Sequence, residues 1–115
     1  MDTRNKIIDA ARAARIAQDG ATVISGYFDP LIAAHAERLA SLKRDGAPLL
    51  VLIATPPAAI LPAAARAQLV AGLVVVDYVC DSPGGLSPHV ALEAEHVEVL
   101  DQLIRHVHAR QRATS

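Results

Sequence analysis

Aromatic residues are scarce in this chain of 115 residues, which has one Phe, two Tyr and no Trp. Its hydrophobic content of 52% therefore comes mainly from Ala, Val, Leu and Ile. Small side chains fill little volume per residue, so we expect a thin core. The length fits one small domain that spans residues 1–115.

The chain also lacks an excess of charge of either sign, because its formal net charge is −1. Nucleic-acid binding needs a concentrated basic face, so we expect no nucleic-acid partner. Cys80 is the only cysteine, which excludes an internal disulfide and favours a reducing, cytoplasmic location. Because Cys80 follows an apolar run, a buried structural thiol is favoured over a nucleophile.

Long hydrophobic runs are absent as well. No apolar stretch reaches the length of a membrane span, and no apolar segment follows the charged start as it would in a signal peptide. We therefore expect no membrane partner.

Apolar runs alternate with helix-like segments along the chain. Three apolar runs predict strands, at residues 22–25, 48–54 and 75–80. Three segments between or before them predict helices, at residues 3–18, 33–44 and 62–73. Short connections between such elements imply right-handed crossovers, and hence an α/β domain with a parallel sheet of about three strands.

The last part of the chain begins after a loop or hinge at residues 81–88. No fourth strand is recognisable there. Residues 89–111 carry an apolar stripe at helical spacing, which includes Val90, Val97 and Ile104 and predicts one long C-terminal helix. The stripe could cover the chain's own sheet or pair with a second copy. Because a small sheet leaves edges to cover, we expect a homodimer.

The most specific pattern follows the first predicted strand. Residues 23–35 read Val-Ile-Ser-Gly-Tyr-Phe-Asp-Pro-Leu-Ile-Ala-Ala-His, which is a strand, a glycine turn and the start of a helix. Such a unit presents free backbone N–H groups and the positive end of a helix to an anion, usually a phosphate.

This segment resembles the Gly-x-Phe-Asp-x-x-His-x-Gly-His motif of the cytidylyltransferase-like nucleotidyltransferases. Gly26, Phe28, Asp29 and His35 fall on motif positions. Arg66, followed by Leu69 and by Val-Asp-Tyr-Val at the third predicted strand, is similar to the family's Glu-Arg…Leu…Val-Asp-x-Val stretch. Over residues 10–81 the chain most resembles the adenylyltransferase domain of bacterial heptose-phosphate enzymes, which take part in ADP-heptose synthesis.

The resemblance implies a minimal Rossmann-like, three-layer domain with strand order 3-2-1 and a ligand cleft at the carboxyl ends of the strands. It implies transfer of a nucleotidyl group from ATP or CTP to a sugar or alcohol phosphate, with release of pyrophosphate. His35 would be the catalytic residue of an active chain. The implied nucleotide site consists of Gly26, Tyr27, Phe28, Asp29, His35 and Arg66. No metal site and no required cofactor are expected, with Mg²⁺ entering only together with a nucleotide.

Several departures from the family pattern argue against turnover. Ile32 stands at the first motif histidine, Ala34 at the second glycine and Ala65 at the acid. Losing one electrostatic contact of this kind typically costs on the order of 10²–10³ in rate. The loop at residues 55–62 is short and apolar where the family has a longer polar segment with a lysine. The family's later strand and its Ser/Thr-rich segment have no counterpart.

Three functional hypotheses follow. The first is a degenerate nucleotidyltransferase-like domain, a pseudoenzyme with at most weak nucleotide or phosphate binding and little or no transferase activity. The second is an active small nucleotidyltransferase that a dimer mate completes. The third is a non-catalytic interaction module that acts through its C-terminal helix. An open cleft over residues 26–29 would favour binding, and a filled one would favour the interaction module.

Each candidate side chain also has a structural interpretation. His35 is either a phosphate ligand or a remnant of an active ancestor, and the sequence favours neither. Asp29 is more typical of a cap on a turn or helix, and Arg66 of a solvent-facing helix residue. His96, three residues after a glutamate, has the spacing of a metal ligand in helical bundles, but a solvated helix face is the favoured interpretation. Asp77 is expected to have a structural role at its strand.

Overall fold

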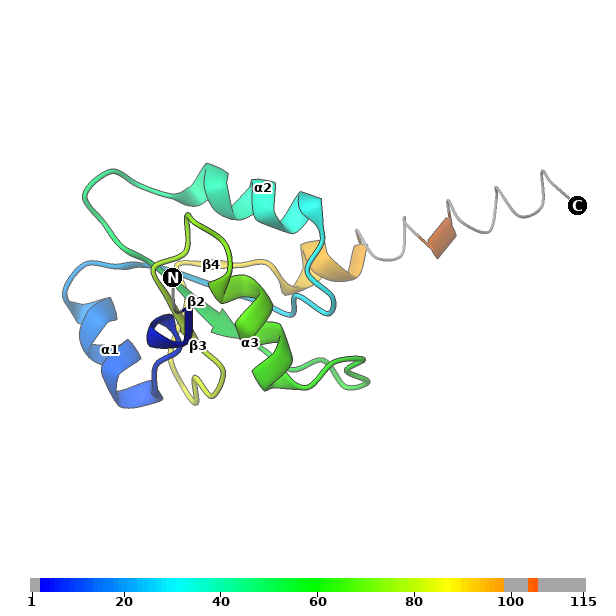
Figure 1. The fold of residues 1–115 in the computed structure, drawn as a ribbon, viewed down its shortest axis with the longest axis horizontal. Coiled ribbons are helices and arrows are strands. Elements are labelled where there is room, and N and C mark those ends of the chain that lie inside the picture. The colour runs from blue at the N-terminus through cyan, green and yellow to red at the C-terminus, as the bar shows by residue number, and fades with distance from the viewer. Residues whose placement is uncertain (1–2, 99–103, 106–115) are drawn as a thin grey trace, which may run out of the picture.

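The computed structural model describes residues 3–98 and 104–105 (Figure 1). Its named elements are the 3-10 helix η1 (Thr3–Lys6), α1 (Ala10–Gln18), β1 (Thr22–Gly26), α2 (Ala33–Leu42), β2 (Leu49–Ile53), α3 (Ala63–Ala71), β3 (Tyr78–Cys80) and β4 (Val90–Ala91). Residues 93–98 are also helical. The four strands are parallel and lie in the order β3-β2-β1-β4. The chain is therefore an α/β, Rossmann-like domain, and the expected order 3-2-1 is confirmed with one strand added.

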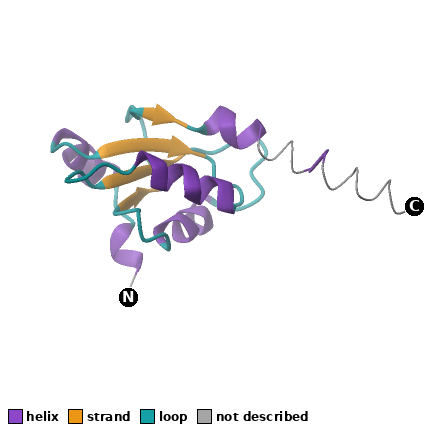
Figure 2. Cartoon of the chain, turned by 90° about the horizontal axis from the view of Figure 1, so that it is seen from above, coloured by secondary structure: helices purple, strands orange, loops and turns teal. Residues whose placement is uncertain are grey.

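The sheet lies between helices on both of its faces (Figure 2). Ile24 of β1 packs into a cluster with Leu39 of α2 and Val70 of α3. Val23, which precedes Ile24 in β1, packs on the opposite face of the sheet in a cluster with Ala13 of α1. All five residues of β2 are buried, as expected for a central parallel strand. Alternation along the strands thus produces the predicted three layers.

The strand β4 differs from the expectation of three strands and a helix from residue 89. Val90 and Ala91 pair in parallel with Ile24 and Ser25 of β1. A strand of two residues is too short to show the alternation of buried and exposed side chains. The helical spacing of the apolar residues that follow it therefore determined the prediction. Helix begins at residue 93 instead. Of the expected helix, residues 99–103 and 106–111 lie outside the described part of the chain.

The first predicted helix is also wrong in its extent, because it is interrupted before α1. Ile7 forms a parallel bridge with Val79, and the N–H of Ile8 donates to the Val79 carbonyl at 2.8 Å. Asp9 then caps α1, with its carboxylate accepting from the N–H of Arg12 at 2.8 Å. The two isoleucines therefore cover the edge of the sheet, and the capping aspartate is the sequence signal that marks the true helix start.

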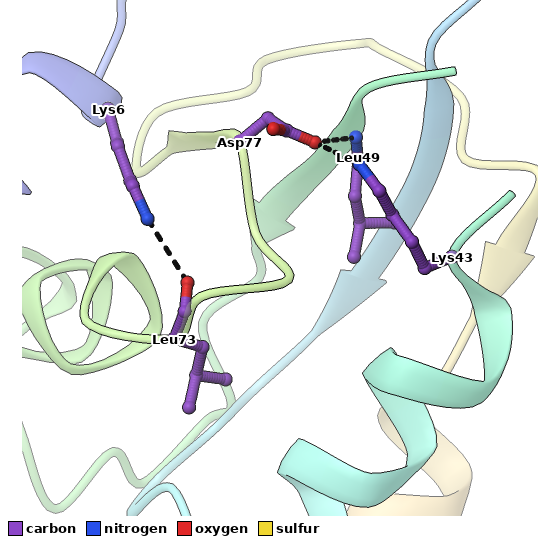
Figure 3. Close-up of polar contacts among 5 residues, drawn as sticks. All are labelled: Lys6, Lys43, Leu49, Leu73 and Asp77. Atoms are coloured by element: carbon purple, nitrogen blue, oxygen red, sulfur yellow. Dashed lines mark hydrogen bonds and ion pairs between the residues drawn. The ribbon is translucent and has the colours of Figure 1, made fainter. Parts of the chain in front are cut away.

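Asp77 fastens the beginning of β2 to the segment that leads into β3 (Figure 3). The N–H of Leu49 donates to the Asp77 carboxylate at 2.7 Å, and the N–H of Asp77 donates to the Leu49 carbonyl at 3.0 Å. Lys43 forms an ion pair with the same carboxylate. Close by, Lys6 Nζ donates to the Leu73 carbonyl at 3.1 Å. The structural role predicted for Asp77 is confirmed.

Candidate functional site

The strand–turn–helix unit lies where the sequence predicts it. β1 ends at Gly26, and α2 begins at Ala33. Between them Phe28 has a positive φ of 49°, and the bond between Asp29 and Pro30 is cis. Phe28 is completely buried, so the turn is anchored in the core by the only phenylalanine of the chain.

The backbone N–H groups of this turn already have a partner within the chain. The N–H groups of Tyr27 and Phe28 donate to Nδ1 of His96 at 3.1 and 3.3 Å. Gly26 makes room for this imidazole. A Cβ on Gly26 would lie 2.8 Å from Cε2 of Phe28 and closer still to Cε1 of His96. Because Gly26 has no side chain, the ring of His96 can pack against the turn.

His96 lies directly against His35. Their ring centroids are 4.0 Å apart with an interplanar angle of 37°, and each residue is only 6% exposed. Phe28 contacts both rings edge-on. Nδ1 of His35 accepts from the N–H of Ile32 at 3.3 Å. A histidine pair is thus present beside the turn, with His35 from α2 and His96 from the helical residues after β4.

Both imidazoles favour the neutral form at neutral pH, because the pKa of each lies below its ordinary value. Burial lowers the pKa of His35, and burial together with repulsion from His35 lowers the pKa of His96 to about 4. Because each Nδ1 accepts a backbone hydrogen bond, the proton of each neutral ring resides on Nε2. Neither Nε2 has a hydrogen-bond partner within the described part of the chain. A nitrogen that carries its proton has no lone pair for a metal, so this arrangement does not suit metal binding.

Asp29 points its carboxylate at the loop before α3. Its two oxygens accept from the N–H of Ile60 at 2.6 Å and from the N–H of Leu61 at 2.7 Å. Asp29 therefore has a capping role, but at another place than the sequence predicts. The capped segment is the distant loop, and not the turn or helix next to Asp29 itself.

Arg66 is fully buried, so its interpretation as a solvent-facing residue is wrong. Nε donates to the Leu61 carbonyl at 3.0 Å, and Nη1 donates to the carbonyls of Tyr27 at 3.0 Å and Ala54 at 2.6 Å. Nη2 donates to Oγ1 of Thr55 at 3.3 Å. Arg66 thus joins the glycine turn, the segment after β2 and the loop before α3. The sequence predicts exposure because an arginine on a helix usually faces solvent. Arg66 is buried because α3 turns this face toward the sheet.

The histidine pair borders a small, mostly apolar cavity of about 140 Å³. Its lining includes Ile32, His35 and His96, together with the Asp29 carboxyl and the exposed side chain of Ile60. Organic ligands are usually held in cavities of about 300–1,000 Å³. A whole nucleotide is therefore too large for this space as it stands.

A larger cavity of about 620 Å³ lies at the carboxyl ends of the strands. Its lining comes from the end of β1 (Ser25), the segment after β2 (Thr55), the loop after β3 (Asp81) and the residues that follow β4 (Glu93). This is the edge where parallel α/β sheets usually bind ligands, and the volume lies in the range of small-molecule pockets.

The structure brings all the predicted site residues to one region of the molecule. These are Gly26, Tyr27, Phe28, Asp29, His35 and Arg66, and most of them contact one another or His96. His96 could not be recognised as a site residue from the sequence, because the apolar stripe of residues 89–111 predicts a long helix with His96 on its solvated face. The break at β4 starts the helix later and turns His96 inward, and a strand of two residues leaves no periodic signal in the sequence.

No protein-family model matches the chain, and no curated protein matches it at a significant level. No helix in the described part of the chain combines the length and the apolar character that crossing a membrane requires. Within that same part, no group of three or more His, Cys, Asp or Glu side chains is placed to hold a metal ion. Functional conclusions therefore depend on the geometry of the site.

Proposed function

We propose that this chain is a nucleotidyltransferase-like domain with little or no transferase activity and at most weak nucleotide binding. The observation that carries the proposal is the pair of hydrogen bonds from the N–H groups of Tyr27 and Phe28 to His96. In a strand–turn–helix phosphate site such N–H groups bind the anion. Here a neutral imidazole of the same chain takes their place as acceptor.

Two further groups support the proposal. The hydrogen bonds that Arg66 forms with the described residues go to neutral oxygens, so this guanidinium is engaged in holding three segments together. The carboxylate of Asp29 lines the cavity beside the histidine pair and repels an approaching phosphate. A single buried cysteine is consistent with a cytoplasmic location.

The test is a titration of the protein with inorganic phosphate, ATP and CTP, with and without Mg²⁺, followed by amide chemical shifts. We expect weak shifts at most for the native chain and no release of pyrophosphate with any sugar or alcohol phosphate. In His96→Ala the two turn N–H groups lose their acceptor, so phosphate binding should be gained. His96→Asn is the matched control, because its amide oxygen can still accept from the turn and should leave phosphate binding weak.

The proposal fails if the native chain releases pyrophosphate, or if ATP saturates shifts at Gly26–Asp29 below millimolar concentration. Ile32→His restores the missing motif residue and provides a second check. If this variant is folded and gains pyrophosphate release, the remaining machinery is competent, and the hypothesis of an active enzyme is favoured.

A second candidate is an interaction module that forms a homodimer. The observation in its favour is the exposure of large apolar side chains near the C-terminal helical residues, where Val97 is 58% and Ile104 is 45% exposed. Light scattering on the native chain and on Val97→Ser tests it. A dimer that dissociates in the variant supports the module, and a monomeric native chain contradicts it.

A further inference from the structure

The cavity at the carboxyl edge of the sheet has an unusual charge for a site in a nucleotidyltransferase-like domain. Its charged lining residues are Asp81 and Glu93, and no Lys, Arg or His is among its described lining residues. Neither carboxylate forms a hydrogen bond or an ion pair within the described part of the chain. The cavity therefore holds two negative charges without a cation at its wall.

One cation lies behind this wall. Arg66 reaches Thr55 through Nη2 at 3.3 Å, but the guanidinium is completely buried and bonded on its other nitrogens. A single charge behind the wall offsets at most one of the two carboxylates. The potential inside the cavity consequently favours a cation and disfavours a phosphate group.

Hydroxyl groups supply the polar contacts of the cavity. Ser25 is 94% buried, because only 6% of it is exposed, and it lines the cavity. Its hydroxyl forms no hydrogen bond with another described residue, and the oxygen is not among the fully enclosed unpartnered atoms, so it is accessible to a ligand. The hydroxyl of Thr55 accepts from Arg66, so its own proton is free to be donated. Ser25 lies at the end of the central strand β1, which fixes its position.

We infer that this cavity binds a small organic cation, namely an amine that also carries hydroxyl groups. Its ammonium group pairs with the carboxylates of Asp81 and Glu93, and its hydroxyls exchange hydrogen bonds with Ser25 and Thr55. The inference goes beyond the proposed function, because it concerns a different cavity and a ligand without phosphate.

Three sugars with the same ring but different charge provide the probes. D-glucosamine at pH 6 is the cation, D-glucose is neutral, and D-glucose 6-phosphate is the anion. Amide chemical shifts are followed for the residues that line the cavity. Two partly exposed ion pairs should make glucosamine bind about threefold to thirtyfold more tightly than glucose. Glucose 6-phosphate should bind more weakly than glucose.

Variants assign the effect to the cavity. The double variant Asp81→Asn/Glu93→Gln should abolish the preference for glucosamine over glucose. The matched control is Glu37→Gln/Asp45→Asn, which removes the same amount of charge from exposed positions that do not line the cavity, and its preference should match the native chain. Ser25→Ala should weaken both sugars, while the bond from the Leu92 N–H to the carbonyl of residue 25 is retained.

Specific outcomes would overturn the inference. These are equal binding of glucosamine and glucose, binding of glucose 6-phosphate as tight as that of glucosamine, an equal loss in the control double variant, or no shifts with any probe at high millimolar concentration. None of these outcomes bears on phosphate binding at the glycine turn, which the His96 variants test separately.

Discussion

The rings of His35 and His96 lie against each other at a centroid distance of 4.0 Å, and each ring accepts a backbone hydrogen bond through Nδ1. One histidine belongs to the first turn of α2, and the other belongs to the helical residues that follow β4. The pair therefore links the glycine turn to the C-terminal part of the domain. Because burial lowers the pKa of both rings, the free energy of unfolding depends on pH.

Stability should fall as the pH is lowered from 6.5 to 4. The pKa of His96 is about 4 in the folded chain, and its ordinary value is 6.5. Between these pH values His96 is protonated in the unfolded chain and neutral in the folded chain, so protonation favours unfolding. The resulting loss in the free energy of unfolding approaches about 3 kcal/mol, and His35 adds to it in the same direction. Urea unfolding at pH 7.5 and pH 4.5 measures the loss. In His96→Asn the difference between the two pH values should shrink, and an unchanged difference would contradict the assignment to His96.

Gly26→Ala should lower the free energy of unfolding by about 1–3 kcal/mol, the usual cost of overpacking a core. The added methyl group meets the rings of His96 and Phe28, which are held by their own contacts. Gly85→Ala is the control, because a Cβ there meets nothing within 4 Å and its φ is not positive. Thermal or urea unfolding of both variants is the measurement. Equal effects in the two variants would mean that His96 is not packed against Gly26.

Arg66→Lys should destabilise the chain by roughly 3 kcal/mol or more. An ammonium group cannot reach the four acceptors of the guanidinium, and each buried acceptor left without a donor costs about 1–3 kcal/mol. The same change at the exposed Arg44 should stay within about 0.5 kcal/mol. Urea unfolding compares the two. If Arg66→Lys leaves the free energy of unfolding unchanged, the hydrogen bonds of Arg66 do not stabilise the fold.

Asp77→Asn should destabilise the chain at neutral pH by about 0.5–1.5 kcal/mol, through loss of the ion pair with Lys43 and a weaker bond from the Leu49 N–H. Partial burial acts to raise the pKa of Asp77, but the hydrogen bonds from Lys43 and Leu49 outweigh it and lower the pKa. The stabilisation is therefore present above pH 3.8 and is lost as the pH falls below that value. The difference in the free energy of unfolding between native chain and variant should therefore be smaller at pH 3 than at pH 7. Asp45→Asn, at an exposed position, should show neither effect.

Much of the fold was predictable because its signals are local. The all-apolar run of β2 and the glycine turn after β1 mark their elements directly, and the burial of Cys80 is confirmed. β4 was not predictable in this way, since two residues carry no periodicity and pair only because β1 presents a free edge. The start of α1 was not predicted correctly, because Ile7 and Ile8 fit the helical spacing but pair with Val79 at the edge of β3.

The candidate site was predictable only in part. The motif locates Gly26, Phe28 and His35 in one unit, since their spacing lies within a single strand–turn–helix segment. The position of His96 depends on where β4 ends, and therefore on packing between segments distant in sequence. The burial of Arg66 likewise depends on which face α3 turns toward the sheet, and the weak amphipathic pattern of an alanine-rich helix does not specify that face.

β1 is one of the two inner strands of the sheet, yet residues 89–96 complete its contacts. Its Val23 N–H donates to Nδ1 of His89 at 2.9 Å, its Ser25 carbonyl accepts from Leu92, and the turn after it is capped by His96. During synthesis on the ribosome these groups stay unpaired until residue 96 has been added. Folding of the domain therefore requires residues 89–96, and a nascent chain halted at residue 88 should remain sensitive to protease where the full chain is protected.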